Sequence, residues 1–133
     1  MRRYVLAMRR ESVSFRVGWI CLLVVGVGIL VFGLVAVVAP GSGDRGLMRA
    51  DGLASIGLGL FGVLIAAIPF RRGERWAWYA FWFYPVFWAV HLIGRLPPGK
   101  DHVHQVVFIA LSLTGLLVTV RWSFPRAAAR LKP

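Results

Sequence analysis

The sequence has few of the residues that stabilise a soluble secreted or cytoplasmic domain. It contains one cysteine, Cys21, so no disulfide can form within the chain, and we interpret it as a small packing residue. Acidic residues are scarce, with five Asp and Glu against sixteen Lys and Arg. The longest apolar stretches also have no polar stripe. This excludes a soluble four-helix bundle, because the outer face of every helix in such a bundle meets water.

Long apolar runs are present instead. Hydrophobic residues make up 59% of the 133 positions, and the mean hydropathy is +0.72. Each run approaches the roughly 20 residues that a helix needs to cross a hydrocarbon core about 30 Å thick. We therefore predict an all-α polytopic membrane protein, a four-transmembrane-helix up-down-up-down bundle that forms one membrane domain over residues 1–133. The expected helices cover about 17–39, 52–70, 76–96 and 103–121, with basic tails at 1–16 and 122–133.

The basic residues gather in alternate segments. Twelve of the sixteen lie in the two tails, at Arg121 directly before the second tail, and in the loop between the second and third runs. The positive-inside rule then predicts that both termini and this loop are cytoplasmic. Because the charge follows the spans, we assign it to orientation and to anionic lipid head groups, and we expect no nucleic-acid partner. The expected location is the bacterial plasma (inner) membrane, with membrane lipids as partners.

Small residues mark one face of the second run. Such a face lets two helix backbones approach closely in lipid, where apolar burial gives little drive for association. Two interpretations remain open: a contact within the chain, or a contact with a second copy or another membrane protein. The residues of this face recur at spacings of three and four: Gly52, Ser55, Gly59, Gly62 and Ala66.

Two turn-rich loops flank the outer side of the membrane, PGSGDRGLMRADG and RLPPGKDHVH. Asp51 is the predicted N-cap of the second helix, since its carboxylate can accept hydrogen bonds from otherwise unpaired amides. Asp101 is predicted to open the fourth helix in the same way.

The third run is crowded with aromatic residues. From Trp76 to Trp88, nine of thirteen positions are Phe, Tyr or Trp. The first of them, with Trp19 and Trp122, are expected to form an aromatic belt at the cytoplasmic interface. Pro85 removes one backbone hydrogen bond and is predicted to bend the helix. The deeper aromatics either fill the core, face lipid, or line a hydrophobic cavity entered from the membrane.

His91 lies near the outer end of this run, at the level of the other polar outer residues. Ionisable groups at membrane depth are costly and usually point inward, so His91 is the candidate for acid–base chemistry. The alternative is a solvated, salt-bridged rim without a site. The candidate ligand-binding residues are Trp82, Tyr84, Phe87, Trp88, His91, Arg95, Asp44, Asp51, Asp101 and His104.

Neither a metal nor another cofactor is predicted. His102 and His104 would lie about 200° apart around a helix that advances about 100° per residue, so they do not form a ligand pair. Haem ligation by His91 and His104 is disfavoured, because both histidines lie near one surface of the membrane instead of facing each other across a plane.

The chain resembles small bacterial integral membrane proteins of the DoxX-like, uncharacterised type. The motifs that carry the resemblance are the outer loop GDRGLMRADG, a glycine-rich helix ending in PFRRGERWAWYAFW, and a proline-kinked aromatic helix with a histidine. The resemblance implies an inner-membrane four-helix bundle with no established activity. A more distant similarity is to the four-helix sterol-isomerase and sigma-2-receptor group, whose sterol-binding cavities depend on acidic residues deep in the membrane. This sequence has no acid at that depth.

The expected function is that of an integral membrane protein without catalysis. It would pack with itself or a partner and bind a lipid or isoprenoid-like ligand in an aromatic pocket. The alternative is a membrane enzyme or transporter component that acts on an apolar substrate at the outer face, with His91 as the acid or base.

Overall fold

The computed structural model describes residues 12–41, 43–95 and 102–124, and these residues form helices joined by turns. Three helical segments are long and apolar enough to cross a membrane. They are α2 (Val13–Val38), α3 (Arg45–Ile65) with its π-helical continuation η1 (Ala66–Phe70), and α6 (Val103–Ser123). The aromatic segment forms two shorter helices, α4 (Arg75–Ala80) and α5 (Phe83–Ile93). The chain is thus a multi-pass membrane protein by the length and composition of its helices.

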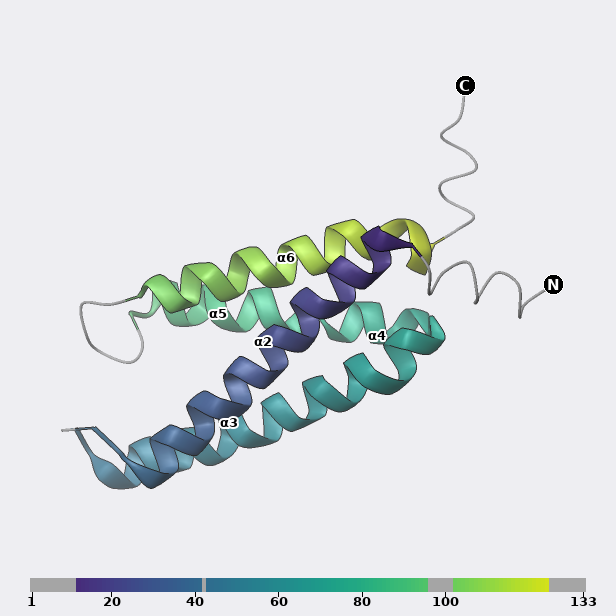
Figure 1. Cartoon of the computed structure of the whole chain (residues 1–133). Coiled ribbons are helices and arrows are strands. Elements are labelled where there is room, and N and C mark those ends of the chain that lie inside the picture. Colours follow the sequence, from purple (N-terminus) through teal and green to yellow (C-terminus); the bar gives the residue numbers. More distant parts are fainter. Residues whose placement is uncertain (1–11, 42, 96–101, 125–133) are drawn as a thin grey trace.

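Figure 1 shows successive passes that run in opposite directions. α2 crosses the molecule, α3 returns beside it, α4 and α5 follow one another along the third pass, and α6 returns beside α5. α2 packs against both α3 and α6. The start of α3 diverges from the end of α5, so the helices are spread at the end opposite the start of α2.

The third pass is interrupted at Phe81 and Trp82 because of Pro85. In a continuous helix, residue 85 would donate to the carbonyl of Phe81, but proline has no N–H and its ring crowds that carbonyl. The N–H of Tyr84 donates to the Phe81 carbonyl instead, over 3.1 Å. The predicted bend is therefore a break in the helix, one turn before the proline, and the single helix expected over 76–96 is wrong.

The second span begins earlier than predicted, and Asp44 caps it. Asp44 Oδ1 accepts hydrogen bonds from the N–H groups of Gly46 and Leu47, at 2.9 and 3.2 Å. Asp51 is exposed within α3, so the prediction that it caps this helix is wrong. Both aspartates precede a helix-compatible run, but only Asp44 has the extended backbone of an N-cap. Asp101, the predicted cap of the fourth span, lies outside the described residues.

The small-residue face of α3 lies buried, with Gly52 and Gly59 against α2 and Gly62 against Tyr84 of α5. A methyl group placed on Gly59 would lie 2.5 Å from the backbone nitrogen of Leu30. One placed on Gly33 of α2 would lie 2.7 Å from the carbonyl oxygen of Gly52. The two backbones approach this closely because neither carries a side chain at the crossing, and the gain is van der Waals contact. All five residues of the face are buried: Gly52, Ser55, Gly59, Gly62 and Ala66.

Two tryptophans of the expected belt bind backbone carbonyls of other helices. Trp19 Nε1 donates to the Ala66 carbonyl at 2.9 Å, and Trp78 Nε1 donates to the Leu116 carbonyl at 3.0 Å. The guanidinium of Arg71 lies 5.1 Å from the Trp19 ring centre, within cation–π range. Trp76 is instead 52% exposed, as expected of an interfacial residue. These contacts join α2 to η1, and α4 to α6, toward the arginine-rich end.

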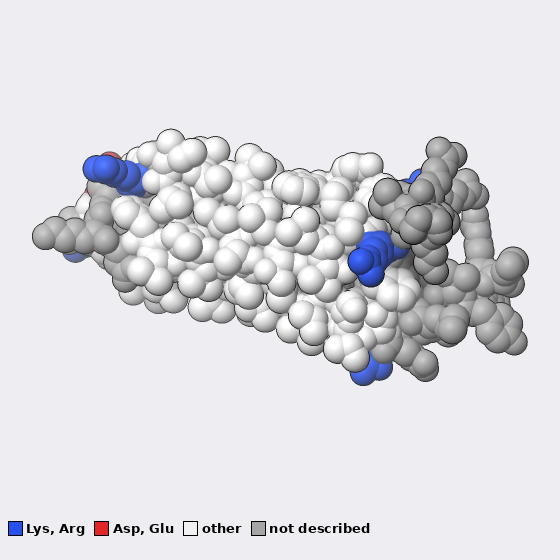
Figure 2. Space-filling model, turned by 90° about the horizontal axis from the view of Figure 1, so that it is seen from above, with Lys and Arg blue, Asp and Glu red and all other residues white. Residues whose placement is uncertain are grey.

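A wide uncharged surface separates the charged ends of the molecule. Figure 2 shows basic side chains toward both ends of the face in view and none across the middle. Large apolar side chains lie exposed on several helices, among them Val31, Phe61, Val86 and Leu117. Such a surface suits hydrocarbon and would be unfavourable in water.

The crossing of α2 and α3 makes a pair of glycine substitutions informative. Gly59→Leu places a side chain against the Leu30 backbone, so we expect a loss of about 1–3 kcal/mol in stability from overpacking. A methyl group on Gly57, in the same helix, would have no neighbour within 4 Å. Gly57→Leu should therefore be tolerated. Thermal unfolding of both variants in detergent, followed by circular dichroism, measures the difference, and equal stabilities would contradict the close helix crossing.

Candidate functional site

A groove opens where the third pass is broken. It has a volume of about 170 Å³ and lies between α3 and the junction of α4 and α5. Apolar and aromatic side chains dominate its walls, so it suits a hydrocarbon group. Its lining residues are Leu58, Phe61, Gly62, Ile65, Ala80, Phe81, Phe83 and Tyr84.

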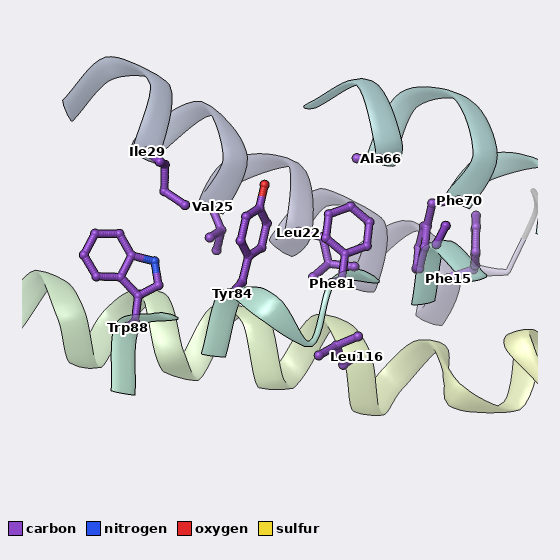
Figure 3. Close-up of a cluster of buried hydrophobic side chains, with 11 residues drawn as sticks. Phe15, Leu22, Val25, Ile29, Ala66, Phe70, Phe81, Tyr84, Trp88 and Leu116 are labelled. Carbon is purple, nitrogen blue, oxygen red and sulfur yellow. The ribbon is translucent and has the colours of Figure 1, made fainter. Parts of the chain in front are cut away.

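Tyr84 forms the inner wall of this groove. Its side chain is 2% exposed and packs against Phe81, with ring centres 5.4 Å apart. The hydroxyl lies between two glycines: it occupies the space of a side chain at Gly62, and a methyl group on Gly26 would lie 2.9 Å from it. Figure 3 shows the hydroxyl pointing away from α5. Glycine at these two positions leaves room for the polar end of the ring.

Trp88, one turn beyond Tyr84, is the centre of a second aromatic cluster. Its ring stacks on Phe108 with centres 5.0 Å apart, and it lies 5.8 Å from His91 and 5.9 Å from His104. His104 in turn stacks on Phe32 of α2 at 6.4 Å. The cluster therefore joins three passes of the chain, and it brings together two of the predicted histidines around one indole.

His91 has a defined tautomer in this arrangement. Its Nδ1 lies 2.9 Å from the carbonyl oxygen of Phe87, and its ring centre is 4.0 Å from that of Phe87. A carbonyl only accepts, so Nδ1 carries the proton and Nε2 is left as the acceptor in the neutral ring. This bond spans one helical turn and orients the imidazole along α5.

Several buried polar atoms have no hydrogen-bond partner among the described residues. They include the Tyr84 hydroxyl, Trp88 Nε1 and His104 Nε2. Buried polar groups are normally hydrogen-bonded, because an unsatisfied one forfeits its interaction with water. The two on α5 belong to side chains that are at least 97% buried, with exposed fractions of 2% for Tyr84 and 3% for Trp88.

The acidic residues at the turn before α3 and at the start of α3 do not join the histidines. Asp44 is exposed at the turn before α3 and Asp51 is exposed in the first turns of that helix, whose start Figure 1 shows apart from the end of α5. Arg95 is exposed with a positive φ of 50°, and within the described ranges no ion pair links it to either aspartate. Asp101 is outside the described residues. The described part of His91's surroundings therefore provides aromatic neighbours and no carboxylate for acid–base chemistry.

Trp82 also lies away from the Trp88 cluster. It is 37% exposed and its nearest aromatic neighbour is Trp78, with ring centres 5.7 Å apart. Trp82 precedes Trp88 by six residues, so the two side chains would lie on different sides of a helix that advances about 100° per residue. Among the described residues, no group of three His, Cys, Asp or Glu is placed to hold a metal ion.

The sequence reasoning missed the contribution of α2 to the site. Gly26 borders the Tyr84 hydroxyl and Phe32 stacks on His104. A signal for the first was present, since buried positions of α2 recur at helical spacing on one side and include glycines. These positions are Phe15, Gly18, Leu22, Val25, Gly26, Ile29, Gly33 and Ala36. Nothing in the spacing of Phe32 distinguishes it from a lipid-facing residue.

The Trp88 cluster makes a testable contribution to stability. Trp88→Ala empties a buried site with four aromatic neighbours, so we expect a loss of about 3–5 kcal/mol. Trp82→Ala removes a side chain that is 37% exposed and lies outside the cluster, so it should lose about 1 kcal/mol or less. Thermal unfolding in detergent compares the stabilities of the two variants. A larger loss of stability for Trp82→Ala than for Trp88→Ala would contradict a stabilising role of the Trp88 cluster.

Comparisons with family models, curated proteins and solved structures find no significant match to this chain. The resemblance to DoxX-like proteins is therefore without support from them. What the structure supports is a multi-pass membrane protein with aromatic clusters and an apolar groove.

Proposed function

We propose that this protein is a non-enzymatic membrane protein that holds part of an apolar lipid, such as an acyl or isoprenoid chain, in the groove at the broken third pass. The observation that carries the proposal is the groove itself, between α3 and the α4–α5 junction. It is apolar and open, and Phe61 and Phe83 beside it are exposed to the surroundings of the helices. At this depth the surrounding solvent is hydrocarbon, so a lipid can enter sideways.

The size of the groove fits a piece of a lipid. Apolar cavities of about 150 Å³ bind a benzene-sized group, and this groove has a similar volume. A ring or a short length of chain would occupy it, while the remainder of the molecule stays in the bilayer. The break at Phe81 and Trp82 favours this use, since irregular backbone in a membrane is tolerated where it lines a cavity.

Association with a second copy or a partner is also part of the proposed function. Because the small-residue face of α3 is buried within the chain, such contacts would use other faces of the helices. Exposed apolar residues on α2 and α6 provide those faces, for example Val31 and Leu117.

A substitution that fills the groove tests lipid binding. Ala80 lines the groove, so Ala80→Phe should occupy it and abolish a bound lipid mass in native mass spectrometry from nanodiscs of native membrane. Ala110→Phe places the same side chain on the exposed side of α6 and should leave the bound mass unchanged. A wild-type protein without bound mass, or one whose bound mass survives Ala80→Phe, would contradict the proposal.

We further propose that the chain lies in a bacterial plasma membrane with both termini in the cytoplasm. Arg71, Arg72 and Arg75 at the turn before α4 support this orientation, together with the basic tails of the sequence. The turn before α3 then faces outward.

Cysteine labelling in intact cells tests this orientation. In a Cys21→Ser background, Gly43→Cys should react with a membrane-impermeant maleimide added outside, because position 43 is exposed in open space. Glu74→Cys, exposed at the arginine-rich turn, should react only after the cells are permeabilised. The reverse pattern would show the opposite orientation.

A further inference from the structure

We propose that the lipid held in the groove carries a neutral, hydrogen-bond-accepting oxygen within its apolar part, and that the Tyr84 hydroxyl binds this oxygen. The ligand class is then a long-chain or polycyclic carbonyl compound and not a plain hydrocarbon chain. This inference rests on the proposed function, because it names the chemistry of the molecule in the same groove.

The first argument is the state of the Tyr84 hydroxyl. Tyr84 is only 2% exposed, and its hydroxyl has no hydrogen-bond partner among the described residues. No water is available in the bilayer core to satisfy it, so an unpaired hydroxyl there is unfavourable. The hydroxyl also lies against Gly62, and both Gly62 and Tyr84 line the groove.

The second argument is a neighbouring donor. Trp88 lies four residues after Tyr84 on α5, one turn along the same face, and its Nε1–H is also buried without a partner among the described residues. Figure 3 shows the indole nitrogen on the side of the ring nearer Tyr84. An indole N–H only donates, whereas a carbonyl oxygen has two lone pairs and can accept from two donors. The indole therefore requires an acceptor, and the tyrosine hydroxyl is able to donate to one.

The third argument is depth. Tyr84 is the central residue of the third pass, equally far from Arg75 at its start and Ile93 at its end. Ester oxygens of bilayer lipids lie near the interface, not at this depth. A charged group is disfavoured, because none of the residues that line the groove carries a charge that could pair with it. The oxygen that reaches Tyr84 is therefore a neutral one carried deep into the hydrocarbon region.

A matched pair of probes tests the inference. 2-Hexadecanone and hexadecane are titrated separately into nanodiscs of purified phosphatidylcholine that contain the protein, and native mass spectrometry measures the bound fraction. We expect the wild type to bind the ketone about three- to tenfold more tightly than the hydrocarbon, the effect of one hydrogen bond. Tyr84→Phe keeps the ring and removes the hydroxyl, so it should bind the two probes equally.

Two control variants separate the possible outcomes. Tyr79→Phe removes a hydroxyl from an exposed tyrosine on α4 and should keep the ketone preference. Ala80→Phe should block both probes. Suppose that Ala80→Phe blocks both probes, but Tyr84→Phe still prefers the ketone or the wild type shows no preference for it. The groove then binds lipid without recognising an oxygen, and this inference fails while the proposed function stands. If the wild type binds neither probe, or Ala80→Phe blocks neither, the proposed function fails with it.

Discussion

The whole structure depends on one constraint, which is that its solvent at mid-depth is hydrocarbon. Backbone groups in such a solvent must be bonded within the chain, and apolar surface gains little from being buried. Helices are held together by close contact instead. The crossing of α2 and α3 meets this requirement, because Gly33, Gly52 and Gly59 bring the two backbones together without intervening side chains. The indole groups of Trp19 and Trp78 add hydrogen bonds to carbonyls of other passes.

The same constraint gives meaning to the break in the third pass. Pro85 cannot donate to the Phe81 carbonyl, and the chain satisfies that carbonyl with a tighter turn. The turn separates α4 from α5 and leaves the apolar groove beside α3. Tyr84 follows directly, and the glycines at 26 and 62 provide the space for its hydroxyl. A backbone irregularity, an apolar recess and a buried polar atom therefore occur together near the middle of the third pass.

The histidines are part of a different feature from the outer acids. His91 and His104 both contact Trp88, which itself stacks on Phe108, so they form the polar edge of an aromatic cluster. Asp44 and Asp51 lie on the separate turn before and within the start of α3. These aspartates do not meet His91, because the start of α3 diverges from the end of α5.

Composition and periodicity by themselves determined the all-helical class, the membrane setting, the approximate extent of α2, α3 and α6, and the small-residue face of α3. These follow from run length and from spacing along a single helix, which are local properties of the chain. The tertiary structure decided which aspartate caps α3, how far Pro85 disrupts the third pass, and which residues meet around Trp88. Whether Gly26 faces Tyr84, or Phe32 faces His104, depends on how two helices are rotated and crossed. That geometry arises from packing among all the passes, so no single segment encodes it.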